Sequence, residues 1–275
     1  MELLVEHDTT YTYDEPVRHS VQYLRLTPNQ SARQTVWRWS VVAPEPMTVF
    51  TDGFGNTVHV LTMAQTAATF TISVRGHVTT SPGASATMNG DEGLPPAVYL
   101  RSTHLTTVEG PVGDLLRVLG PIQGDMAGVE RIAAAVADRF TYTAGATDAA
   151  TTAADALGRG QGVCQDYVHV LVACCRALNI PARYVSGYYR ADPNGIDYDA
   201  NHAWAEAYLP DLGWMGVDVT NRTPVDERYI RLACGLDYLE AAPVRGMRRG
   251  GGNEGMQVRV RVAVPRAGGS GGQQQ

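Results

Sequence analysis

Three polar side chains in the second half of the sequence have the chemistry of a nucleophilic enzyme site. Cys164 stands in the segment Gly-Val-Cys-Gln-Asp, and His202 and Asp218 follow it along the chain. A thiol attacks a carbonyl group as the thiolate, which a nearby imidazolium or the positive end of a helix stabilises. The imidazole in turn needs a carboxylate that fixes its tautomer and stabilises its cation. These residue types suit a cysteine nucleophile, a histidine base and an aspartate that orients the base.

Cys164 is expected in the first turn of a helix. A glycine-rich approach, 158–162, precedes it, and apolar residues recur at helical spacing from 164 to 178. The unpaired N–H groups and the dipole at such a helix start favour a thiolate and can stabilise an oxyanion beside the sulfur. The alternative is that Cys164 is a small buried hydrophobic residue, a common state of a free cysteine. Cys174 and Cys175 lie mid-helix among apolar residues, and we interpret both as core.

His202 is the best placed of the seven histidines to act as the base. His169 follows the cysteine on the same helix and points roughly 140° away from it around the axis. His202 instead lies in a strand-like segment, 201–208, where polar and aromatic residues alternate with alanines. The turn composition of 210–213 predicts a hairpin with a returning strand over 214–220.

The register of this hairpin decides whether a carboxylate reaches the imidazole. If the turn is centred on Pro210, Asp218 lies directly opposite His202. Taken singly, His202 also fits an ordinary half-buried strand position and Asp218 a cap near a turn. A zinc site formed with Cys164 is a further alternative, although the sequence has no C-x-x-C or H-x-x-x-H spacing.

The elements that must position these side chains suggest an α+β protein in two domains. Residues 1–85 are expected to form an antiparallel β-sandwich, because β-branched and aromatic residues are dense in several segments divided by turns. These segments are 20–28, 34–44, 57–63 and 67–79.

A stretch rich in Pro, Gly and Ser, 81–93, marks the domain boundary. Residues 86–265 then mix helix and strand, with helical patterns at 113–119 and 126–140. The tail, 266–275, is mostly Gly, Ser and Gln, and is expected to be flexible.

Composition and charge argue against several classes of partner. The formal net charge is -6 and the 22 Lys and Arg residues are scattered, which argues against nucleic acid; one basic cluster, 245–249, is expected in a solvated loop. No apolar run approaches membrane-spanning length, and residues 1–7 lack the pattern of a signal peptide, so we expect no membrane association and a cytoplasmic location. The four cysteines have no disulfide-like spacing and are expected to be reduced.

Taken together, the segments resemble the transglutaminase-like superfamily of papain-like cysteine enzymes. The blocks that carry the resemblance in the second half are 162–166, 180–188, 202–206, 213–214 and 218–221. Those in the first half are 7–13, 20–28 and 52–56, which look like the β-rich N-terminal region of bacterial members. By this resemblance Cys164 is the nucleophile, His202 the general base and acid, and Asp218 the residue that orients it. Many members carry a proline after the aspartate, where this chain has Val219.

The resemblance implies an acyl transfer or hydrolysis through a thioester. The thiolate attacks a carboxamide or peptide carbonyl of a protein or peptide substrate, and water or an amine releases the acyl group. Hydrolysis is slightly favoured, because water needs no pocket of its own; a noncatalytic peptide-binding protein of the same fold is the alternative. We expect no metal or organic cofactor and no dependence on calcium. Candidates for a side chain in the oxyanion hole are Tyr142, Tyr188 and Trp204.

Overall fold

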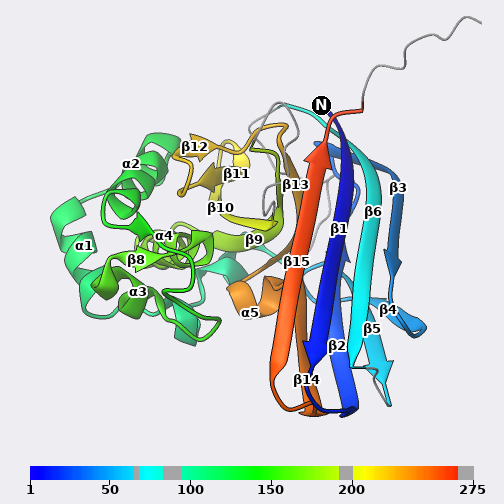
Figure 1. Cartoon of the computed structure of the whole chain (residues 1–275). Helices are drawn as coiled ribbons and strands as arrows, with labels where there is room; N and C mark the ends of the chain where they lie inside the picture. Colours follow the sequence, from blue (N-terminus) through cyan, green and yellow to red (C-terminus); the bar gives the residue numbers. More distant parts are fainter. Residues whose placement is uncertain (65–67, 83–93, 192–200, 266–275) are drawn as a thin grey trace, which may run out of the picture.

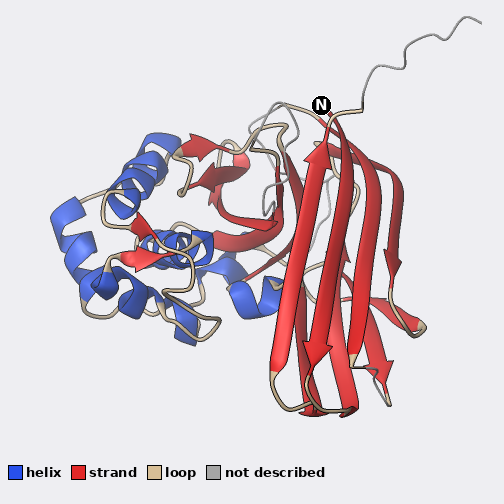
Figure 2. Cartoon of the chain, in the orientation of Figure 1, coloured by secondary structure: helices blue, strands red, loops and turns tan. Residues whose placement is uncertain are grey.

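The structure is a computed structural model that describes residues 1–64, 68–82, 94–191 and 201–265. A β-sandwich lies beside a mixed unit in which helices pack around a five-stranded sheet (Figure 1). Most of the helices gather on the side away from the sandwich, and one short helix lies beside it (Figure 2). This arrangement confirms the expected fold class, an antiparallel β-sandwich followed by an α+β domain.

The sandwich consists of two four-stranded antiparallel sheets. One sheet has the order β15-β1-β6-β3, with bounds Glu254–Ala263, Glu2–Tyr13, Thr69–Thr80 and Gln34–Val42. The other has the order β14-β2-β5-β4, with bounds Val244–Gly250, Val17–Thr27, Thr57–Met63 and Met47–Thr51. Every second residue of β1 from Leu3 to Tyr13 is buried, as expected for a strand with one face against a second sheet.

The two last strands correct the expected domain organisation. We expected 86–265 to form one domain, but β15 pairs with β1, and β14 pairs with β2. The basic cluster at 245–249, expected in a loop, lies in β14 instead. The sandwich therefore draws strands from both ends of the chain, and the α+β unit is inserted between them. The expected tail, 266–275, and most of the expected linker lie outside the described residues.

The α+β unit is built around one buried helix, α4 (Cys164–Ala177). Every residue from 166 to 176 is buried, because other helices and the sheet cover α4 on all sides. The other helices are α1 (Pro111–Leu119), α2 (Met126–Ala137), α3 (Ala153–Arg159) and α5 (Tyr238–Ala241), with two short 3-10 helices, η1 (Pro96–Leu100) and η2 (His104–Thr106).

The five-stranded sheet has the order β12-β11-β10-β9-β13. Its bounds are Thr223–Pro224, Gly213–Asp218, Asn201–Leu209, Ala182–Tyr189 and Tyr229–Gly235. The alanines of β10 pack into the same core as α4, whereas Trp204 belongs to a separate cluster, so the alternation predicted for this strand is confirmed. A short parallel pair, β7 (Thr141–Tyr142) and β8 (Gln161–Gly162), leads into α4.

Two side-chain amides join the sandwich to the α+β unit. Gln34 donates from Nε2 to the Arg231 carbonyl at 3.0 Å and accepts from the Arg231 N–H at 2.9 Å. Asn56 makes the same two-point pairing with Cys234, at 2.7 and 2.8 Å. Both partners lie in β13, so the sandwich holds this strand through its backbone.

Among the helices that the structure describes, none is both long and apolar enough to cross a lipid bilayer.

Candidate active site

Cys164 is the first residue of α4, as predicted, and its side chain is half-buried. The start of the helix is fixed by Asp166, whose Oδ2 accepts from the Val163 N–H at 2.8 Å and from the Thr147 hydroxyl at 2.7 Å. Burial raises the pKa of the Asp166 carboxyl, although these two hydrogen bonds oppose the shift. A Cβ atom at Gly162 would lie 2.5 Å from Asp166 Oδ2, so this turn requires glycine. Gly162 therefore leaves the space that the capping carboxyl of Asp166 occupies.

His202 lies between the thiol and a carboxylate. Its Nε2 is 2.6 Å from Asp218 Oδ2, and the ring is close enough to Cys164 for the thiol to affect its pKa. Burial opposes a charge on the ring, but the hydrogen bonds and charges of Asp218 and Cys164 outweigh it and raise the pKa of His202 to about 10. The imidazole is therefore a cation at neutral pH, next to the thiol.

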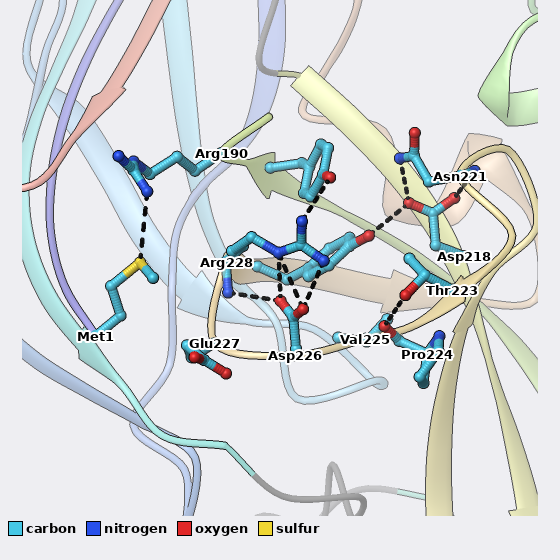
Figure 3. Close-up of polar contacts among 12 residues, drawn as sticks. Met1, Arg190, Asp218, Asn221, Thr223, Pro224, Val225, Asp226, Glu227 and Arg228 are labelled. Carbon is cyan, nitrogen blue, oxygen red and sulfur yellow. Dashed lines mark hydrogen bonds and ion pairs between the residues drawn. The ribbon is translucent and has the colours of Figure 1, made fainter. Parts of the chain in front are cut away.

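Asp218 is fully buried and accepts four hydrogen bonds. Besides His202, it accepts from the Tyr229 hydroxyl at 2.8 Å, the Asn221 side chain at 2.7 Å and the Asn221 N–H at 3.1 Å. The side chains of Asn221 and Asp218 face each other at the end of β11, whose last residue is Asp218 (Figure 3). Burial opposes ionisation of Asp218, but His202 and Asn221 prevail and lower the pKa of its carboxyl. A buried carboxylate so fully hydrogen-bonded stays ionised and holds the ring in place.

The hairpin that joins β10 to β11 has a different register from the predicted one. Leu209 pairs with Gly213 and Ala205 with Val217, so the turn is centred one residue later than expected. Asp218 is therefore diagonal to His202 rather than directly opposite. The observed pairing differs from the predicted pairing by two residues. Because side chains alternate with a period of two, His202 and Asp218 still lie on the same face of the sheet and contact each other.

The other predicted residues fall into clear roles. Cys174 and Cys175 are buried free thiols, and burial raises the pKa of Cys174 to about 12. His169 is fully buried, and its Nε2 accepts from the Tyr238 N–H at 3.1 Å, so it does not serve the thiol.

The three candidates for the oxyanion hole separate. Tyr188 is fully buried and its hydroxyl lies 2.7 Å from His7 Nδ1, in the sandwich. Trp204 is buried against Tyr229, with ring centroids 5.3 Å apart. Tyr142 pairs with Gly162 across β7 and β8, two residues before the thiol, and its side chain is exposed. Of the three, only Tyr142 has a position suited to a substrate.

Two partners of the carboxylate were missed from the sequence. Asn221 lay in a matched block without an assigned role, although its position three residues after Asp218 is the spacing of a local cap. Tyr229 carries no local signal, because it reaches Asp218 only through the placement of β13 beside β9.

In the part of the chain that the structure describes, no group of three or more His, Cys, Asp or Glu residues is arranged to hold a metal ion. Cys164, His202 and Asp218 are therefore not arranged as zinc ligands in the described residues.

Comparison with known proteins agrees with this architecture. Two family models match the chain, that of the transglutaminase-like superfamily over residues 116–219 and that of the bacterial transglutaminase-like N-terminal region over residues 3–79. A buried helix that starts at a thiol, packed on a sheet that supplies imidazole and carboxylate, defines the class of papain-like α+β proteins. Within that class, the chain belongs to the transglutaminase-like superfamily.

Three proteins illustrate the similarity. An uncharacterized protein of Mycobacterium tuberculosis is 31% identical over 88% of this chain and 86% of its own. A protein of Cytophaga hutchinsonii proposed to be a cysteine protease has the same fold, with a TM-score of 0.77 and 22% identity over 98% of this chain and 92% of that chain. A protein-glutamine gamma-glutamyltransferase of Pseudomonas aeruginosa is 34% identical over 98 residues, which are 32% of this chain and 14% of that protein.

Proposed function

We propose that the protein is a cysteine-dependent enzyme that hydrolyses or transfers amide or peptide acyl groups through a thioester on Cys164. The observation that carries this proposal is the position of His202, which is hydrogen-bonded to Asp218 and lies within electrostatic reach of Cys164 at the start of α4. The protonated imidazole stabilises a thiolate, and the N-terminal end of the helix adds to that effect.

The proposed reaction has two stages. The Cys164 thiolate attacks the carbonyl carbon of a carboxamide or peptide bond, and the negative charge passes to the carbonyl oxygen of a tetrahedral intermediate. His202 then gives its proton to the leaving amine as the carbon–nitrogen bond breaks, which leaves a thioester and a neutral imidazole. In the second stage His202 takes a proton from water or from an amine, which attacks the thioester and releases Cys164.

The substrate that we propose is a protein or peptide. The similarity to a gamma-glutamyltransferase supports transfer to an amine, and the similarity to a proposed cysteine protease supports hydrolysis. We favour hydrolysis, because water needs no binding pocket of its own. We also propose a cytoplasmic location, which is compatible with four free thiols. Cell fractionation would test this location.

Mass spectrometry of a peptide library tests the proposal. The wild-type protein is incubated with the library with and without a primary amine, beside the Cys164→Ala variant. Chain cleavage, deamidation or amine incorporation that requires Cys164 identifies the reaction. If peptides bind tightly but are not chemically altered, this result would support a noncatalytic peptide-binding protein and refute the proposed enzyme activity.

A further inference from the structure

A cavity of about 410 Å³ lies between the two sheets of the sandwich, at the edge formed by β14 and β15. Its volume is within the range of small-ligand sites, roughly 300–1,000 Å³. Residues of β1 and β15 line it from one sheet, and residues of β2 and β14 from the other. This edge of the sandwich faces α5 and the α+β unit (Figure 1).

The strand sequences create this cavity. The inward face of β1 changes from Leu3 and Val5 to His7 and Thr9, and all four side chains are buried. Gly246 pairs with Gln22 across β14 and β2, and a Cβ atom there would lie 2.9 Å from Gln22 Cγ and 2.5 Å from a backbone oxygen. Glycine at this position leaves room for the Gln22 side chain, which lines the cavity.

The cavity holds polar groups without a partner. Gln22 is 6% exposed, and among the described residues its Oε1 has no hydrogen-bond partner. Asn201, which also lines the cavity, has an unpartnered buried Oδ1 in the same part of the structure. Buried polar atoms are nearly always hydrogen-bonded, so these two acceptors at one cavity are available to a ligand with N–H or O–H donors.

The charge of the cavity indicates a neutral ligand. Burial lowers the pKa of His7 to about 4, so this lining residue is uncharged at neutral pH. The lining also includes Arg248 and Glu254, which form an ion pair at 3.1 Å and cancel each other.

The cavity adjoins the candidate active site. Asn201 directly precedes His202 in β10, and Tyr238 lines the cavity from α5. Burial raises the pKa of Tyr238, and the charge of Cys164 adds to the rise, so this lining residue is within electrostatic reach of the thiol.

We propose that this cavity is a subsite for an uncharged, extended segment of a peptide substrate, whose backbone pairs with the amides of Gln22 and Asn201. The inference rests on the proposed function. A primary amide offers a donor and an acceptor side by side, which matches one peptide unit. The chain already uses this pairing, since Gln34 and Asn56 hold the backbone of β13 in the same two-point manner.

Photo-crosslinking to the full-length Cys164→Ala protein tests the subsite without turnover. The probes are acetylated and amidated hexapeptides of Gly, Ala, Ser, Thr, Val and Gln that carry one diazirine-bearing residue. We expect crosslinks to the lining residues Tyr11, Met247 or Met256, mapped by mass spectrometry. Crosslinks elsewhere only, equal labelling by Lys- or Glu-rich hexapeptides, or occupancy by a neutral oligosaccharide without peptide labelling would overturn the proposal.

Matched variants identify the residue responsible. Gln22→Met keeps the side-chain volume but removes the amide, and we expect a fall of about tenfold in crosslinking at subsaturating probe. Gln257→Met, at an exposed position of β15, leaves crosslinking unchanged. Met247→Trp adds bulk at a lining residue and should also lower crosslinking. Because Met247 is exposed, we expect this variant to fold. Unchanged crosslinking in both Gln22→Met and Met247→Trp refutes the subsite.

The failures of the two proposals are distinguishable. If probes crosslink at the cavity but the wild-type protein shows no acyl chemistry, the subsite is supported and the proposed enzyme activity is refuted. If the wild-type protein is active and Gln22→Met does not change its KM for the hexapeptides, the enzyme activity is supported and the subsite is refuted.

Discussion

Replacement of Asp218 by Asn should remove the positive charge of His202 next to the Cys164 thiol. In the native protein the pKa of His202 is raised from 6.5 to about 10, against the effect of burial, by hydrogen bonds and charges of Asp218 and Cys164. Without the carboxylate charge, burial prevails and the ring is neutral at pH 7. Cys164 then loses the cation that favours its reactive form, so its alkylation at pH 7 should slow by about tenfold.

The assay is the rate of iodoacetamide modification of Cys164, followed by mass spectrometry from pH 5 to pH 10. The advantage of the native protein over the variant should disappear as the pH approaches 10, where His202 loses its proton. Asp226→Asn is the matched control, because the ion-pair partner of Asp226 is Arg228, at 2.6 Å (Figure 3). Cys174 should label slowly in every protein, since it is fully buried. A rate for Asp218→Asn within twofold of the native rate at pH 7 would refute the reasoning.

Three further predictions concern stability and the start of α4. Gly162→Ala should lower both the melting temperature and the alkylation rate, because its Cβ would lie 2.5 Å from a capping carboxylate, whereas Gly113→Ala, with open space at its Cβ, should do neither. Arg183→Leu should cost about 2–3 kcal/mol in urea unfolding, because Glu206, 2% exposed, loses its partner at 2.6 Å and keeps the longer ion pair with Arg231 at 3.8 Å; a loss below about 1 kcal/mol would contradict this. Because the pKa of His202 rises from 6.5 to about 10 on folding, its contribution to stability is complete below pH 6.5 and disappears as the pH approaches 10; urea midpoints should decline over that window, and His202→Gln should flatten the decline.

The candidate site was predictable from local patterns to a large extent. The glycine-rich approach and the helical period placed Cys164 at a helix start, and strand alternation placed His202 on the face that Trp204 shares. The hairpin error shows the limit of this reasoning. Turn centres depend on local backbone geometry that composition does not specify, but the alternation of side chains made an error of two residues harmless.

What the sequence did not reveal depends on pairing between distant segments. β14 and β15 lie more than 200 residues after the strands with which they pair, and the glycines and arginines of β14 suggest a loop. Tyr229 reaches Asp218 only because β13 is the neighbour of β9 and not of β11. No local signal encodes such neighbours.

The use of both chain ends in one sandwich has a consequence for the order in which the protein folds during synthesis. The ribosome makes β1 and β2 first, but their outer hydrogen-bonding edges stay open until 244–263 emerges. The intervening unit, with α4 and its sheet, is complete before that moment. A nascent chain halted before residue 244 would therefore carry a finished α+β unit beside two unprotected strand edges, which are prone to pair with other chains. The strands synthesised after the α+β unit protect those synthesised before it.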